Sequence, residues 1–133
     1  MKKNSAAVYF EIEFFEKLLK GKPGYVDVLI PLAEAYTKAG LYAKGLEMDE
    51  RLVRFKPDDP LVHYNLACSY SLLGKVDMAF KTLEKAVSLG YDDFKFMDSD
   101  PDLSTVRQDQ RYQNMISSIV NKKGEANGNN EPV

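Results

Sequence analysis

The feature that most constrains the fold of this chain is an internal repeat with a period of about 34 residues. The spacing between Pro23 and Pro57 equals the spacing between Pro57 and Tyr91. Overlaying the windows 26–59 and 60–93 brings residues of the same kind together. The matched positions are Leu32-Ala33 with Leu66-Ala67, Tyr36 with Tyr70, Gly40 with Gly74, Leu46 with Phe80 and Val53 with Val87. A period of this length predicts stacked helix–turn–helix units whose neighbours share one core.

Apolar residues inside each window recur at steps of three or four, which is the spacing of one helix face. The predicted helices cover 5–20, 27–39, 42–55, 60–73, 76–89 and 109–120. Gly or Pro ends the first five, and no stretch alternates with period two for long enough to predict a strand. The fold class is therefore all-α. Pro31 is expected in the first turn of a helix that begins near Asp27 or Val28.

The residues at these fixed positions resemble the pattern of the tetratricopeptide repeat family. That family has small residues at its eighth and twentieth positions, which here are Ala33, Gly45, Ala67 and Ala79. It also has a Tyr at the eleventh position, a Gly at the turn and a Pro near the end, matched by Tyr36, Gly40 and Pro57. The resemblance implies a short right-handed solenoid of helix hairpins, an α-α superhelix.

The resemblance also implies how the chain is divided, with atypical elements at both ends of the stack. The expected parts are a half-repeat helix at 1–25, full repeats at 26–59 and 60–93, and a capping segment with a final helix at 94–120. Residues 91–102 are acidic and contain Pro101, which predicts a loop or short turns. Asn, Gly and Lys dominate 121–133, which predicts a disordered tail after a single domain over 5–120.

One departure from the family pattern is a carboxylate on an apolar stripe. A large apolar residue is usual at the twenty-fourth position, where the first window has Asp49. A carboxylate there should be hydrogen-bonded or reach water, and we expect a structural bond to a nearby Tyr. Leu29 and His63 are the residues at the position where the family often has Trp.

The first helix of each pair lines a concave groove in this family. Carried over by position, the groove residues are Asp27, Ile30, Glu34, Thr37 and Lys38 from the first window and Tyr64, Asn65, Cys68 and Ser71 from the second. Tyr64 would supply apolar contact, and Asn65 would bond the backbone of a partner through its amide. The resemblance implies a non-enzymatic adaptor or scaffold that binds a segment of another protein. The alternative is a solvated face of a stability scaffold.

A clamp for the carboxylate tail of heat-shock chaperones, known in a subset of this family, is not expected. Asn65 and Lys95 match that clamp. Ile30 and Glu34 occupy the places of its first Lys and Asn, and Ser99 occupies the place of its Arg. Glu34 would repel a carboxylate, so the charges needed for anion capture are missing.

The sequence offers no candidate catalytic residues. His63 and Cys68 lie five apart on one predicted helix, and that spacing puts them about 140° apart around its axis. They therefore cannot form a base and nucleophile pair. As the single cysteine, Cys68 favours a reducing compartment, and the cytoplasm is the predicted location. We expect no cofactor and no small-molecule substrate.

Nucleic acid, membrane and metal binding are not expected either. The net charge is −2 and the apolar runs are too short to cross a bilayer. Asp98, Asp100, Asp102 and Asp109 have the spacing of a calcium loop. However, Leu103 occupies the place that needs Gly, and Pro101 stiffens the segment. Asp100 and Asp109 are expected to be helix caps instead.

The first predicted helix carries more apolar surface than one helix contact uses. Tyr9, Phe10 and Phe14 add to a stripe formed by Val8, Ile12, Phe15 and Leu19. Contiguous apolar surface usually marks an interface. The alternative function is therefore a self-associating scaffold, a homodimer joined through this helix, and a solvated end cap is the third possibility.

Overall fold

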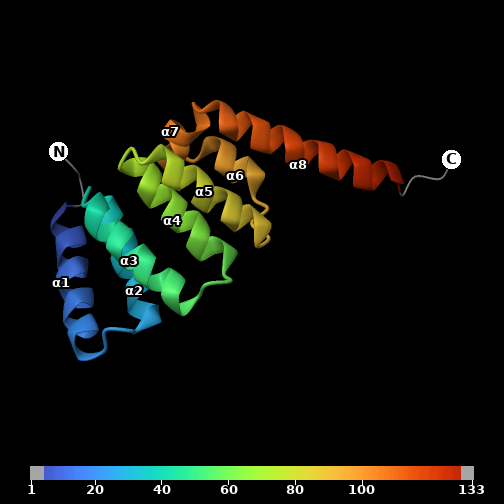
Figure 1. Ribbon diagram of the computed structural model, residues 1–133. Helices are drawn as coiled ribbons and strands as arrows, with labels where there is room; N and C mark the ends of the chain where they lie inside the picture. Colours follow the sequence, from blue (N-terminus) through green and yellow to red (C-terminus); the bar gives the residue numbers. More distant parts are fainter. Residues whose placement is uncertain (1–4, 130–133) are drawn as a thin grey trace.

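The computed structural model describes residues 5–129 as a stack of antiparallel helices (Figure 1). Helix α1 (Ser5–Gly21) precedes a first pair, α2 (Val26–Lys38) and α3 (Tyr42–Phe55). A second pair follows, α4 (Pro60–Leu72) and α5 (Val76–Ser88). Each helix packs on the next in the sequence, and no strand occurs among the described residues. The all-α helical-hairpin fold predicted from the sequence is confirmed.

Local residue chemistry sets the turns between these helices. Gly40 and Gly74 have φ values of 78° and 73°, a left-handed backbone that other residues avoid, and they close the turn inside each pair. Asp59 caps α4, because its Oδ1 accepts a hydrogen bond of 2.9 Å from the backbone N of Leu61. Pro60 occupies the first helical position, where its missing N–H costs nothing.

Pro31 lies deeper in its helix than the sequence predicted. Helix α2 starts at Val26, because the carbonyl of Tyr25 already accepts hydrogen bonds from Val28 and Leu29. Pro31 is then past the first turn and cannot donate a bond to the carbonyl of Asp27. The prediction that it lies in the first turn was wrong.

The core consists of two hydrophobic clusters. The first joins α1, α2 and α3 and includes Ile12, Leu29, Leu32 and Leu52. The second joins α4 and α5 to the C-terminal elements and is built on residues such as Leu83, Met97 and Leu103. Val62 of α4 extends the first cluster toward the second pair. The boundary between the clusters runs between α3 and α4.

Short C-terminal elements cover the second pair. They are α6 (Phe94–Ser99), the 3-10 turn η1 (Pro101–Leu103) and α7 (Ser104–Arg107). Met97, Leu103 and Val106 are fully buried there. The guanidinium of Arg107 donates to the backbone carbonyls of Met97, at 2.9 Å, and of Asp100. The segment predicted as loop or short turns is therefore a fixed part of the second cluster.

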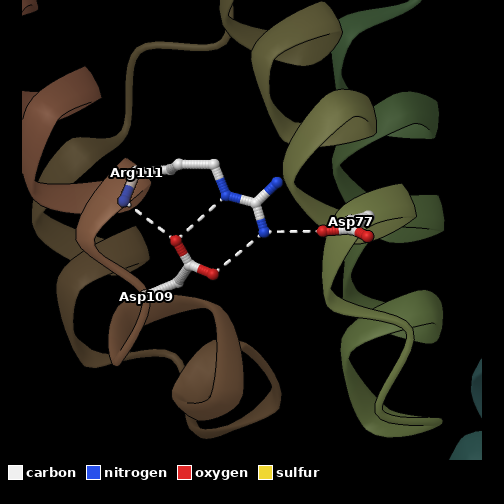
Figure 2. Close-up of polar contacts among 3 residues, drawn as sticks. All are labelled: Asp77, Asp109 and Arg111. Atoms are coloured by element: carbon white, nitrogen blue, oxygen red, sulfur yellow. Dashed lines mark hydrogen bonds and ion pairs between the residues drawn. The ribbon is translucent and has the colours of Figure 1, made fainter.

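Both predicted aspartate caps are confirmed. The Asp100 carboxylate accepts from the backbone N of Asp102 at 3.0 Å, and Asp109 accepts from that of Arg111 at 2.9 Å. Figure 2 shows that the Arg111 guanidinium also reaches Asp77 of α5, at 2.8 Å. Arg111 lowers the pKa of Asp109 to about 2 by hydrogen bonding. This arrangement ties the start of α8 (Gln110–Asn129) to α5.

Helix α8 is longer than predicted and extends away from the stack (Figure 1). The sequence predicted a disordered tail from residue 121, whereas the structure continues the helix to Asn129. Extending an existing helix avoids the cost of nucleating a new one. The last four residues of the predicted tail lie outside the described part of the chain.

Candidate functional site

A pocket of about 310 Å³ lies where α2, α3 and α4 meet, at the boundary of the two hydrophobic clusters. Helix α6 and the segment that begins η1 close one end. Its lining comes from all five elements: Ile30, Ala33, Glu34, Thr37, Lys38, Asp49, Leu52, Tyr64, Asn65, Cys68, Ser69, Leu72, Phe96, Asp100 and Asp102. We refer to it as the inter-pair pocket.

Most of the groove residues proposed from the sequence line this pocket. They are Ile30, Glu34, Thr37, Lys38, Tyr64, Asn65 and Cys68. Asp27 is exposed in the first turn of α2, outside the lining. Ser71 is 2% exposed, and its hydroxyl has no hydrogen-bond partner among the described residues. Ser71 belongs to α4, which packs against α3, α5, η1 and α7.

Tyr64 forms a fixed wall of the pocket. Its hydroxyl donates to Asp100 Oδ2 at 2.6 Å, and its ring stacks on Tyr91 with centroids 4.1 Å apart. Burial, and next the bond to Asp100, raises the pKa of Tyr64, so the hydroxyl stays protonated. Its apolar contact with a partner is limited, because only 2% of the residue is exposed.

Asp49 lies on the pocket wall that α3 contributes. It is 5% exposed, and its Oδ2 accepts a hydrogen bond of 2.5 Å from the hydroxyl of Ser69 on α4. The prediction of a Tyr partner was wrong, because α4 presents Ser69 at the α3 contact. Burial raises the pKa of Asp49 to about 6, against the lowering effect of Ser69, and the nearby charge of Glu34 adds to the rise.

Asp100 and Phe96 are site residues that the sequence did not reveal. Asp100 Oδ2 accepts from Tyr64 and, at 3.7 Å, from the thiol of Cys68. Phe96 is 49% exposed beside Tyr64, with ring centroids 6.3 Å apart. Thirty-six residues separate Asp100 from Tyr64, so no local spacing could predict their contact. The predicted helix cap at Asp100 was the one sequence signal for the structure of this segment.

His63 and Cys68 have separate partners. His63 Nε2 donates to the carbonyl of Pro57 at 2.7 Å, which holds the residue near the start of α4. Burial raises the pKa of the Cys68 thiol, and the charge of Asp100 raises it further. A protonated thiol is a weak nucleophile. Among residues 5–129 no three His, Cys, Asp or Glu side chains gather as metal ligands.

Several large apolar side chains of α1 are open to solvent. Tyr9 is 50% exposed, Phe10 72%, Phe14 51% and Leu18 40%, and the charged residues Glu13 and Lys17 are exposed among them. Val8, Ile12 and Leu19 belong to the first cluster. No helix in the described part of the chain has both the length and the apolar character needed to cross a membrane.

Comparison with known proteins identifies the repeats. A model of the tetratricopeptide repeat family matches residues 5–67, from α1 into α4. Residues 5–67 therefore carry tetratricopeptide repeat sequence. Proteins of this family generally mediate protein–protein interaction. The matched region contains the α2, α3 and α4 contributions to the inter-pair pocket up to Asn65.

The chain is similar in sequence to a plant protein and in structure to a solved protein. The chain is 37% identical over 87 residues to a chloroplastic protein of Arabidopsis thaliana. The aligned region covers 63% of the chain and 26% of that protein. It thus spans about a quarter of the length of this relative. The solved structure titled MamA RS-1 ArsTM double mutant aligns with a TM-score of 0.62 at 20% identity. That alignment covers 83% of the chain and 70% of MamA, and it shows a shared fold.

Proposed function

We propose that this chain is an adaptor or scaffold without catalytic activity, which binds a segment of another protein in the inter-pair pocket and the groove around it. The observation that carries the proposal is the composition of the pocket lining. It combines exposed polar side chains, such as Glu34 on α2, with apolar surface from Ile30 and Phe96. A few placed polar groups on an apolar wall are typical of binding sites.

The wall of the pocket is held in shape before any partner arrives. Tyr64, Asp100 and Cys68 form one hydrogen-bonded group, and Ser69 bonds Asp49 across the α3–α4 contact. A preformed site loses less entropy when a partner binds. Extended segments and helices are both able to dock in such grooves, with the amide of Asn65 available for a backbone bond.

Affinity capture from a native extract tests this function. The groove variant combines Glu34→Ala, Asn65→Ala and Phe96→Ala, and it leaves Tyr64 in place because that residue belongs to the core. The control combines Glu47→Ala, Phe55→Ala and Asn114→Ala, which removes the same residue types outside the pocket. We expect a partner on the wild type and the control that is absent from the groove variant, with circular dichroism unchanged in all three. A partner retained equally by all three would move the site elsewhere.

Self-association through α1 is the second candidate function, and the exposure of Tyr9, Phe10 and Phe14 favours it. Because α1 is the first helix of the stack, its outer face has no preceding helix to cover it among the described residues (Figure 1). A second copy would cover it by apposing the same face across a two-fold axis. Such a dimer would leave the inter-pair pocket open, so both functions are compatible.

Sedimentation over a range of concentrations tests the dimer. We expect the average mass of the wild type to rise toward that of two chains, and Phe10→Ser to remain monomeric. Phe55→Ser removes a comparably exposed ring, 53% exposed on α3, and should behave as the wild type. A wild type that stays monomeric at every concentration would contradict the dimer. The cytoplasmic location predicted from the sequence stays a prediction, which fluorescence of a tagged chain in its native cell would check.

A further inference from the structure

The inter-pair pocket is lined by more acidic than basic side chains. Its lining includes four carboxyl groups, from Glu34, Asp49, Asp100 and Asp102, and one amino group, from Lys38. The other titratable groups are Tyr64 and Cys68, whose raised pKa values keep them neutral. The charge that the pocket presents to a partner is therefore negative.

The four carboxyl groups differ in what they already bind. Asp100 accepts hydrogen bonds from Tyr64, Cys68 and the backbone of Asp102, so its oxygens are used to hold the wall together. Asp49 accepts from Ser69, and no cation is among the groups that set its pKa. A buried carboxylate with a neutral donor is the group that gains most from a cation brought by a partner.

The surroundings of Asp49 fit a long basic side chain. Ile30 on α2, Leu52 on α3 and Leu72 on α4 supply apolar surface around it. The (CH₂)n stem of a lysine or arginine packs on such surface while its charged head reaches a polar group. Glu34 lines the same pocket as Asp49, and its charge adds to the rise in the pKa of Asp49. A cation bound between the two would interact favourably with both carboxylates. A volume of about 310 Å³ suits one or two side chains rather than a folded domain.

We infer that the inter-pair pocket selects a partner segment by one lysine or arginine side chain, whose cation binds between Asp49 and Glu34. This inference rests on the proposed function and specifies its partner. Charge complementarity argues for it: four acidic groups line a small pocket whose apolar walls leave room for a stem. The backbone of the segment would run along the exposed side of α2 and α4, past Asn65.

A displayed library of random peptides of about a dozen residues provides the probe, since a segment of that length is enough to fill a groove of this kind. The full chain is the bait at neutral pH, and sequencing reports which residues are enriched. An enriched peptide is then labelled, and its dissociation constant is measured by fluorescence anisotropy. Asp49→Asn tests the carboxylate and keeps the acceptor for Ser69. Asp58→Asn makes the same charge change at an exposed residue outside the pocket. In the peptide, norleucine replaces the basic residue to keep its stem without the charge.

We expect enriched peptides to share a lysine or arginine next to apolar residues. Asp49→Asn and the norleucine peptide should each weaken binding about tenfold or more, and the two changes together should do little more than either alone. Asp58→Asn should bind as the wild type. Peptides that lack a basic residue, or an Asp49→Asn variant that binds equally well, would overturn the inference. If the triple groove variant lost those peptides, the groove would remain the proposed binding surface. A wild type that enriches no peptide would contradict both the inference and the proposed function.

Discussion

The two helix pairs differ in chemical character at one pair of equivalent buried positions. Asp49 on α3 and Leu83 on α5 are separated by one full period of the repeat and therefore occupy equivalent places in the two pairs. Leu83 is fully buried in the second cluster, whereas Asp49 is 5% exposed and lines the inter-pair pocket. In the second pair this position contributes to the core. In the first pair the same position is a carboxylate that burial disfavours.

A second pair of equivalent positions keeps the same residue types. Tyr36 donates to Glu16 on the preceding helix at 2.5 Å. Tyr70 lies one period after Tyr36, and Glu50 lies one period after Glu16. Burial and next the charge of Glu50 raise the pKa of Tyr70. The repeat therefore keeps a Tyr and a Glu at these positions, whereas Asp49 and Leu83 differ in chemical character.

The largest loss of stability should come from placing an aspartate in the second pair at the position equivalent to Asp49. Leu83→Asp removes a fully buried apolar side chain and buries a carboxylate, which we expect to destabilise the fold by at least about 4 kcal/mol. Urea denaturation measures the loss. Lys81→Asp introduces the same residue at an exposed place on α5 and should change stability little. A mild effect of Leu83→Asp would mean that the two positions are equally tolerant.

Asp49→Asn should change stability in the opposite direction. The folded state holds the pKa of Asp49 at about 6, above the ordinary value of 3.8, so it binds a proton that the unfolded state releases between these values. The stability of the wild type therefore falls as pH rises from about 4 through 6. Asn has no charge to bury, and at neutral pH it should stabilise the fold by up to about 3 kcal/mol.

The pH series provides the control for that prediction. The stability difference between Asp49→Asn and the wild type should shrink as the pH is lowered toward 4, where both side chains are neutral. Thermal unfolding at several pH values measures it. A difference that does not vary with pH would contradict the assignment of the raised pKa to Asp49.

A smaller effect is expected from Ser69→Ala, which removes the hydrogen bond that α4 donates to Asp49. A buried carboxylate left without this donor should cost about 2 kcal/mol at neutral pH. Ser88→Ala removes a hydroxyl that is exposed on α5 and should be nearly neutral. Urea denaturation measures the free energy of unfolding of both variants. Equal losses would mean that the Ser69 hydrogen bond makes no specific contribution to stability.

Gly74→Ala should have the smallest effect of the four. A Cβ added at Gly74 would meet no other atom within 4 Å, but the φ of 73° disfavours an alanine, so we expect a loss of about 1 kcal/mol. Gly40→Ala, at the equivalent turn with a φ of 78°, should cost about the same. Thermal unfolding of the two variants compares the turns. Unequal losses would show that the pairs differ in more than the position of Asp49.

The sequence predicted the stack well because its signals are local. Gly40 and Gly74 end helices by backbone conformation, and Pro57 and Pro60 bracket the turn between the pairs, so the five main helices follow from spacing and these residues. The start of α2 was misplaced because Tyr25 begins a turn without any capping side chain.

The inter-pair pocket could be predicted only in part. Steps of three and four on α2 identified Ile30 and Glu34, because one helix face determines both. The contacts of Asp49 with Ser69 and of Asp100 with Tyr64 join segments 20 and 36 residues apart. Their pairing depends on how the helices pack in three dimensions, which no local sequence pattern specifies. Ser71 was assigned to the groove from its place on one helix face, and that pattern does not reveal its burial in the folded chain.

The most direct test of the central claim is the pH dependence of binding for a basic peptide selected on the wild type. Binding of a cation requires ionised Asp49, whose pKa of about 6 means that about one tenth of the molecules are ionised at pH 5. The wild type should therefore lose about tenfold in affinity between pH 8 and pH 5, whereas Asp49→Asn should bind weakly and with little change. Glu34, Asp100 and Asp102 are present in both proteins, so the difference between the two curves reports Asp49. Parallel curves for the two proteins would contradict the claim that this carboxylate, costly to the fold, is the binding group of the pocket.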